Sequence, residues 1–211
     1  MSSPKIEYIF RRVFCLCLLF GTSLSLAVDD NPVQIRTLTN GLRVVVRPST
    51  DADLASVHVR VNAGLRNENE FAGTGITHFI EHMIFKGSPE TGVGELARQI
   101  RAIGGYVNAY TGLDATTFHA TVPAEHVNAC MDLLGNAVMS PGFDAKEVER
   151  ERAVILNEIR LHRDNPQREL DRALYATAYT RHPYRLPLIG YDELFKKISR
   201  DELVRYHERA Y

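Results

Sequence analysis

The sequence predicts an α+β fold in which a mostly antiparallel sheet is covered by helices. Three observations lead to this prediction. The Asn40-Gly41 pair, the dipeptide most typical of a tight hairpin turn, separates two apolar runs. The run over 55–61 alternates apolar and polar side chains, as a half-buried strand does. From residue 124 onwards, helical patterns dominate.

The first two strands are expected at 33–37 and 42–46, on either side of the Asn40-Gly41 turn, and therefore pair antiparallel. In the third strand, over 55–61, the apolar residues share one face. His58 falls on the opposite face, so a solvent-side position is more typical of it than a role as a metal ligand.

The remaining elements are bounded by glycine, proline and capping residues. Gly104 and Gly105 end one helix, Pro123 ends a strand, and Ser199 is a plausible cap of the last helix. Residues 182–190 form a proline-broken loop. In order, the expected elements are helices over 76–85 and 94–103, strands over 106–111 and 116–122, and helices over 124–138, 144–164, 167–179 and 199–211.

The first 27 residues differ in composition from the rest. A basic start precedes an apolar run over 13–26, and Ser25-Leu26-Ala27 offers small residues for cleavage. This run of 14 residues is shorter than the roughly 20 that a membrane-spanning helix needs, which favours an export signal over a membrane anchor. The Arg11-Arg12 pair leaves the export route open. We predict a signal peptide over 1–27 and a periplasmic or secreted mature domain over 28–211.

Charge and cysteine content narrow the class of protein. With 25 basic and 26 acidic residues, the chain has a formal charge of −1 and no basic field that would favour nucleic acid. Only Cys130 lies beyond the signal, so no internal disulfide is expected in the mature domain. Cys130 falls on an apolar helical stripe and is expected in the core.

The segment His78-Phe-Ile-Glu81-His82 carries the clearest chemical pattern. On a helix, residues three and four apart share a face, so these three polar side chains lie together. Two imidazoles at this spacing can both bind a tetrahedral zinc ion, and the carboxylate can reach a water at an open fourth position, as hydrolysis requires. An amphipathic helix that carries these residues by chance is the alternative, and a third ligand is needed to decide.

The helix predicted over 144–164 offers a third ligand. Glu158 and Glu151 are seven residues apart, about two helical turns, and so lie on nearly the same line. A carboxylate on the apolar stripe of a helix is costly unless it is paired or bound to a metal. Because this helix also has several glutamates that water would hydrate, the pattern alone leaves a surface position for Glu158 equally open.

Four stretches then occur in a defined order. They are the His78-Phe-Ile-Glu81-His82 motif, GGYVNAYTGLDATTFHATVP at 104–123, Glu158 placed 76 positions after His82, and HPYRLPLIG at 182–190. Together they resemble the insulinase/pitrilysin family of zinc metallopeptidases, the inverted zincins, and most of all its processing-peptidase-like and bacterial members. The resemblance runs from about Gln34 to Tyr211.

This resemblance implies that His78, His82 and Glu158 bind one Zn²⁺ per domain. It also implies that Glu81 is the general base and that Glu151 supports a ligand histidine. The chemistry agrees, because zinc brings the pKa of its bound water towards about 7, so that Glu81 can remove the proton and pass it to the leaving amine. A zinc-bound histidine usually needs its other nitrogen held by a carboxylate or carbonyl, a role open to Glu151.

By the same resemblance, the strand over 106–111 pairs with an extended substrate, and Asn108 and Ala109 are the substrate-binding residues. An ordinary sheet strand is the alternative. The histidines outside the motif have no partner at ligand spacing and are expected to be structural or surface residues. Among them, His162 ends its helix, where a cation is favourable.

Members of this family carry two or four related domains, whereas the chain resembles one. We therefore expect a second copy or a companion chain to supply the usual second half. Two functions stay open. The first is a zinc-dependent endopeptidase that hydrolyses extended or short peptides. The second is a non-catalytic partner or assembly subunit that keeps the fold. The presence of all the implied catalytic side chains favours the endopeptidase. No nucleic acid partner is expected, and no membrane span once the signal is removed.

Overall fold

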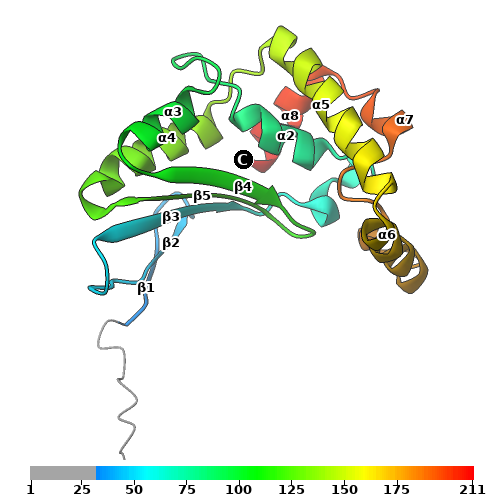
Figure 1. The fold of residues 1–211 in the computed structure, drawn as a ribbon. Helices are drawn as coiled ribbons and strands as arrows, with labels where there is room; N and C mark the ends of the chain where they lie inside the picture. The colour runs from blue at the N-terminus through cyan, green and yellow to red at the C-terminus, as the bar shows by residue number, and fades with distance from the viewer. Residues whose placement is uncertain (1–31) are drawn as a thin grey trace, which may run out of the picture. The chain divides into compact units, whose positions relative to one another are not determined.

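The computed structural model describes residues 32–211 (Figure 1). The signal peptide predicted over 1–27 lies outside this range. Among the helices of the described residues, none has the length and apolar character needed to cross a membrane. The chain divides into two compact units, with the boundary between Ala52 and Asp53.

The first unit contains a hairpin of strands β1 (Gln34–Thr37) and β2 (Arg43–Val46), paired antiparallel. Gly41 adopts a φ of +87°, a conformation that favours glycine. Asn40 accepts a hydrogen bond from the Leu42 amide at 3.1 Å through its side chain. The predicted hairpin is confirmed, with both strands beginning one residue later than expected. Apolar side chains on both strands are exposed, including the directly opposed Ile35 and Val45.

The second unit is built on a three-stranded antiparallel sheet in the order β3-β5-β4. Its strands are β3 (Leu54–Val61), β4 (Tyr106–Thr111) and β5 (Thr116–Pro123). β3 alternates between exposed and half-buried positions, as its sequence predicts. His58 is on the exposed face, stacked on His119 of β5 with ring centroids 5.5 Å apart, so its predicted solvent-side position is confirmed.

The α-helices of this unit follow the predicted order with small shifts at their ends. They are α2 (Ile76–Ile84), α3 (Glu95–Ala102), α4 (Val127–Met139), α5 (Ala145–Arg163), α6 (Pro166–Ala178), α7 (Asp192–Phe195) and α8 (Arg200–Ala210). Short 3₁₀ turns lie at η1 (Leu65–Asn67), η2 (Asn69–Phe71), η3 (Ala124–His126) and η4 (Pro183–Arg185). The 3₁₀ turn η3 delays the start of α4 relative to the prediction. The sequence did not predict α7, because a single turn is too short to show a helical period.

Helices α3 and α4 cover one face of the sheet, while α2 contacts β4, α5 and α8 (Figure 1). The core fills the space between these elements, and α2 contributes Phe79, Ile80 and Met83 to it, all fully buried. Cys130 of α4 is also buried in this core, which confirms its expected place. Helices thus pack on an antiparallel sheet, and the predicted α+β class is confirmed.

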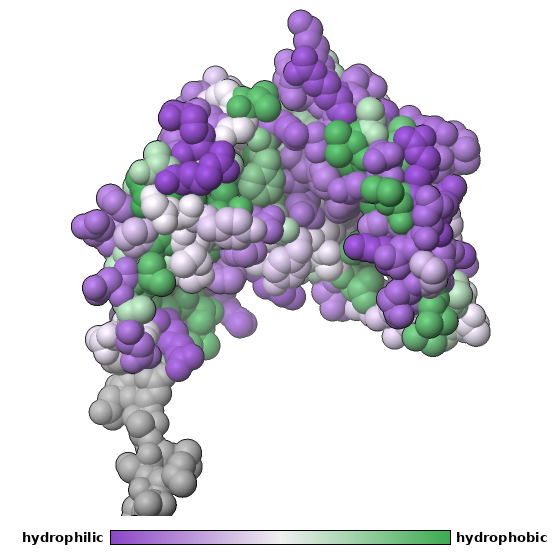
Figure 2. Space-filling model, viewed as in Figure 1, coloured by the Kyte–Doolittle hydropathy of each residue, from purple (hydrophilic) through white to green (hydrophobic). Residues whose placement is uncertain are grey.

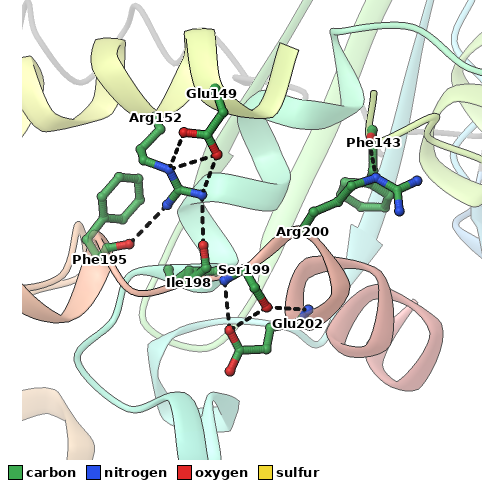
Figure 3. A network of polar contacts seen from close by, with 8 residues as sticks. All are labelled: Phe143, Glu149, Arg152, Phe195, Ile198, Ser199, Arg200 and Glu202. Carbon is green, nitrogen blue, oxygen red and sulfur yellow. Dashed lines mark hydrogen bonds and ion pairs between the residues drawn. The ribbon is translucent and has the colours of Figure 1, made fainter. Parts of the chain in front are cut away.

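A polar network joins α5 to the end of α7 and to the residues that precede α8 (Figure 3). Arg152 of α5 donates hydrogen bonds to the carbonyl oxygens of Phe195 at 3.3 Å and Ile198 at 2.8 Å. Immediately afterwards, Ser199 and Glu202 form a capping box that starts α8. Because Ile198 is buried, its carbonyl oxygen needs a protein donor such as Arg152.

Arg152→Gln is expected to lower the free energy of unfolding by about 1–3 kcal/mol, because the substitution deprives a buried carbonyl of its charged donor. Urea-induced unfolding followed by circular dichroism measures the change. Arg160→Gln on the same helix is the matched control, since Arg160 is exposed and should shift the free energy by less than about 0.5 kcal/mol. Equal effects of the two substitutions would contradict this role of Arg152.

Candidate metal centre

Helix α2 carries the histidine motif, and two glycines fix the chain around its start. Gly75 has a φ of +77°, and a Cβ there would lie 2.3 Å from the carbonyl oxygen of Ile189. Reciprocally, a Cβ on Gly190 would lie 2.3 Å from the carbonyl oxygen of Thr74. The proline-broken segment over 182–190 is therefore held directly against the start of α2, with no room for a side chain at the crossing.

Glu68 lies beneath the first turn of α2 with no exposed surface. Its carboxylate accepts hydrogen bonds from the backbone amides of Gly73 at 3.2 Å and Thr77 at 3.3 Å. Burial raises the pKa of Glu68 to about 7, although these hydrogen bonds act in the opposite direction. Sequence reasoning missed this residue, because no spacing distinguishes it from the neighbouring Glu70.

The packing of α2 against α5 brings the three predicted metal ligands together. His78 Nε2 and His82 Nε2 are 3.2 Å apart. Glu158 Oε2 lies 3.8 Å from His78 Nε2 and 3.7 Å from His82 Nε2. Around a zinc ion with ligand distances near 2.0–2.1 Å, tetrahedral donors lie roughly 3.3–3.5 Å apart. The donor types and their spacing therefore fit a zinc ion after adjustments of a few tenths of an ångström.

Glu151 connects one of these histidines to a lysine. Its Oε1 atom accepts a hydrogen bond from His82 Nδ1 at 2.7 Å, and its Oε2 atom is paired with Lys86 Nζ at 2.6 Å. Burial alone would raise the pKa of Glu151, but the contacts with His82 and Lys86 lower it below its usual value. With the proton of His82 held on Nδ1, Nε2 is left with a lone pair for a metal.

Burial favours the neutral form of His78. Burial lowers its pKa to about 3, and the neighbouring His82 acts in the same direction. A neutral imidazole is the form that binds metals. Its buried Nδ1 has no hydrogen-bond partner among residues 32–211. The orientation of the His82 ring is therefore fixed by a carboxylate, whereas that of His78 depends on packing.

Glu81 points into the same centre from α2. Thr111, at the end of β4, donates a short hydrogen bond to its Oε2 atom. Burial raises the pKa of Glu81, while this hydrogen bond lowers it in part. The carboxylate thus combines a fixed orientation with an increased affinity for protons. Thr111 lies in the strand predicted to bind substrate, but its contact with Glu81 was not predicted.

A cavity of about 850 Å³ opens beside these residues. His78, Glu81 and Glu158 line it on one side, and Ala109 lines it from β4. Further lining comes from the last turn of α5, from α6 and from the segment over 184–191. His162, which the sequence predicted to be a structural or surface residue at the end of its helix, also lines the cavity.

The two predicted substrate-binding residues occupy different positions. β4 is an edge strand, since it pairs only with β5 among the described residues. The Ala109 amide donates to Asn108 Oδ1 at 2.9 Å rather than to β5, and so points to the open edge. Asn108 is exposed, does not line the cavity, and donates to the Tyr106 hydroxyl at 2.8 Å. The Asn108 side chain therefore lies along the open edge of β4, where it accepts the hydrogen bond of the Ala109 amide.

Comparisons with known proteins identify the class of protein. Residues 43–192 match the family model described as "Insulinase (Peptidase family M16)". The chain belongs to this family of metallopeptidases, and the resemblance seen in the sequence is confirmed.

Several known proteins are similar to this chain over most of its length. A protein of Arabidopsis thaliana named "Probable mitochondrial-processing peptidase subunit beta" is 35% identical over 178 residues, which cover 84% of this chain and 33% of that protein. An "Uncharacterized zinc protease" of Bacillus subtilis is 31% identical over 175 residues, covering 83% and 42%. The crystal structure of a protease from Helicobacter pylori superimposes with a TM-score of 0.79 at 27% identity, covering 84% of this chain and 43% of that one. The chain thus spans well under half the length of these relatives.

Stability is expected to depend on pH through Glu68. Its pKa is raised from an ordinary value of 4.5 to about 7 in the folded chain, so the folded state binds this proton more tightly. The resulting stabilisation is complete below about pH 4.5 and is lost as the pH rises through about 7, for a total of about 3 kcal/mol.

Urea unfolding at a series of pH values measures this dependence. Glu68→Gln should flatten the curve between about pH 5 and 7, because the amide does not titrate. Glu70→Gln is the matched control, since Glu70 is exposed and pairs with Arg209 on the surface. A curve that keeps its slope in Glu68→Gln would assign the pH dependence to another group.

Proposed function

We propose that this chain is the catalytic, N-terminal domain of a zinc-dependent endopeptidase that hydrolyses extended or short peptides. The observation that carries the proposal is the convergence of His78, His82 and Glu158 from two helices, with Glu81 beside them in one cavity. Membership of a metallopeptidase family supports the general class. The ligand set and the cleavage of peptides by this chain are the proposed part.

Glu81 is the general base in this mechanism. Its raised pKa increases its affinity for the proton of an attacking water, and it then delivers that proton to the leaving amine. Thr111 keeps the carboxylate directed towards the metal ligands. When bound, a zinc ion supplies a lower pKa for the water and polarises the scissile carbonyl. Glu151 keeps His82 in the tautomer that presents Nε2 to the metal.

The open edge of β4 is the proposed binding site for the peptide backbone. The outward-pointing Ala109 amide is a donor that a substrate carbonyl can use in strand addition. Asn108 Oδ1 occupies that donor in the structure, so a bound peptide takes over the position of the Asn108 side chain. The edge residues Ala109 and Thr111 also line the cavity with Glu81, which brings a peptide on this edge to the metal centre.

A second domain or companion chain is proposed to complete the cleft. The chain spans 33–43% of the relatives described above, and one of them is named as a subunit. On α6 no residue is buried, and Leu170 and Leu174 share an exposed apolar stripe. Figure 2 shows hydrophobic surface over α6 at the lower right. Light scattering of the purified protein measures its oligomeric state, and a peptide-cleavage assay on the same sample measures its activity. A monomer whose cleavage rate does not rise when a second half is added would contradict the need for a partner.

Export is proposed from residues 1–27 alone. Their basic start, apolar run and small residues fit a cleaved signal peptide. The mature protein should begin at Val28, which intact mass and amino-terminal sequencing measure. A chain that retains Met1 after expression in a bacterium with a working export pathway would contradict the proposal.

Glu81→Gln is expected to leave zinc content unchanged and to lower peptide cleavage by about 10²–10⁴-fold, because the amide cannot accept the proton. Metal analysis and a fluorogenic extended peptide measure the two effects. Glu90→Gln, an exposed position outside the cavity, is the control and should retain full cleavage. If the zinc-loaded wild type cleaves no peptide, alone or with its second half, the non-catalytic partner function holds instead.

Glu158→Ala is expected to abolish tight zinc binding while the helical content stays intact, since Glu158 supplies the third donor atom and is partly exposed. Competition with a chelating dye measures the affinity, and far-ultraviolet circular dichroism measures the helical content. Unchanged zinc affinity would remove Glu158 from the ligand set.

A further inference from the structure

The cavity extends beyond the metal centre to the end of α5 and to α6. In this region its charged side chains are Arg163, Arg168, Glu169, Asp171 and Arg172. None of them takes part in the proposed hydrolysis. Their charge therefore bears on which peptides the cavity holds.

The carboxylates of this region already have partners. Glu169 Oε2 is paired with Arg172 Nη2 at 2.8 Å. Asp171 Oδ1 accepts a hydrogen bond from Gln167 Nε2 at 3.2 Å. The remaining two cations differ, because neither Arg163 nor Arg168 has a carboxylate oxygen within 4.0 Å among the described residues. Two guanidinium groups thus line the cavity without a salt bridge to a carboxylate of the described residues, although Arg163 acts at longer range on Glu169 and Asp192.

Asp114, which contacts the cavity residue Tyr184, already has a basic partner. Asp114 accepts a hydrogen bond from the Tyr184 hydroxyl at 2.6 Å and is paired with Arg66 at 3.2 Å. Tyr184 lines the cavity, but Asp114 does not. The carboxylate of Asp114 is therefore paired with Arg66 and forms no salt bridge with Arg163 or Arg168.

Arg168 contacts His162, at the end of α5. Its Nη1 atom lies 2.5 Å from His162 Nε2. Burial lowers the pKa of His162 and Arg168 lowers it further, which favours the neutral ring that can accept from the guanidinium. His162 and the proposed metal ligand His78 line the same cavity. The guanidinium of Arg168 thus contacts a side chain of the cavity that also holds the proposed metal ligands.

Apolar and aromatic side chains line the same cavity as these arginines. Tyr175, Leu186, Leu188 and Tyr191 belong to this lining. Arg163 and Arg168 are themselves exposed, but charges of one sign in a cleft attract a counter-ion more strongly than the same charges on an open surface.

We propose that Arg168 and Arg163 bind a carboxylate of the peptide substrate, so that the cavity selects peptides with an acidic group near the cleaved bond. This rests on the proposed function, because the ligand is a peptide held at the metal centre. The planar guanidinium matches the geometry of a carboxylate and can bind it through two hydrogen bonds. The acidic group is either a glutamate or aspartate side chain or a free carboxyl terminus.

Peptide binding to the zinc-loaded Glu81→Gln protein tests the proposal without requiring cleavage. A single glutamate is moved stepwise through a neutral peptide with blocked ends, and each peptide is compared with its glutamine analogue by fluorescence anisotropy. A second series compares a free with an amidated carboxyl terminus. One of the two series should show a preference of about 10-fold or more for the carboxylate, whereas solvated surface arginines would give less than about 5-fold.

Substitutions assign the preference to these residues. Arg168→Gln and Arg163→Gln, introduced together, should reduce it to about 2-fold or less, and Arg168→Glu should reverse it in favour of a lysine-containing peptide. Arg98→Gln is the matched control, because Arg98 is an exposed helical arginine outside the cavity. The proposal is overturned if no position discriminates, if the preference survives the double substitution, or if no peptide binds. Failure of the endopeptidase function appears separately, as wild-type protein that binds these peptides and leaves them uncleaved.

Discussion

The packing of α2 against α5 is the constraint on which the site depends. These two helices alone supply His78, Glu81, His82, Glu151 and Glu158. Buried apolar residues on both helices belong to one core cluster. The distances between the donor atoms are therefore set by the core, and a shift of one helix by an ångström would break the spacing that a zinc ion requires of its ligands. Core packing thus determines the geometry of the proposed metal site.

Buried charge in this region is tolerated because each acidic group has donors of its own. Glu151 has His82 and Lys86, and Glu68 has the amides at the start of α2. An unpaired carboxylate in either place would carry a penalty of several kcal/mol or would take up a proton. The two glutamates differ in the outcome: the contacts with His82 and Lys86 lower the pKa of Glu151, whereas burial raises the pKa of Glu68 to about 7 despite its hydrogen bonds from two amides.

Helical spacing was enough to predict a part of the site. His78 and His82 are one turn apart, and Glu151 and Glu158 are two turns apart, so a period of 3.6 residues places each pair on one face. That the two faces meet is a long-range contact, and only the family resemblance pointed to it. Lys86 was within reach of the same argument, because it lies four residues after His82.

Other contacts could not be read from local patterns. Glu68 meets α2 through a turn of irregular backbone, and Thr111 meets Glu81 across 30 residues of chain. The relation between His162 and Arg168 depends on the angle between α5 and α6, which no periodicity encodes. For the fold, the hairpin and the long helices followed from turn chemistry and period, whereas the sheet order β3-β5-β4 required knowledge of which strands meet.

The exposed β1–β2 hairpin has a practical consequence. Two strands of four residues each expose apolar side chains, and isolated hairpins of this size are marginal in water. Such edges recruit strands from neighbouring molecules at high concentration. Preparations of this polypeptide by itself are therefore prone to self-association through its amino-terminal ribbon, and charged replacements at Ile35 or Val45 offer a route to well-behaved samples.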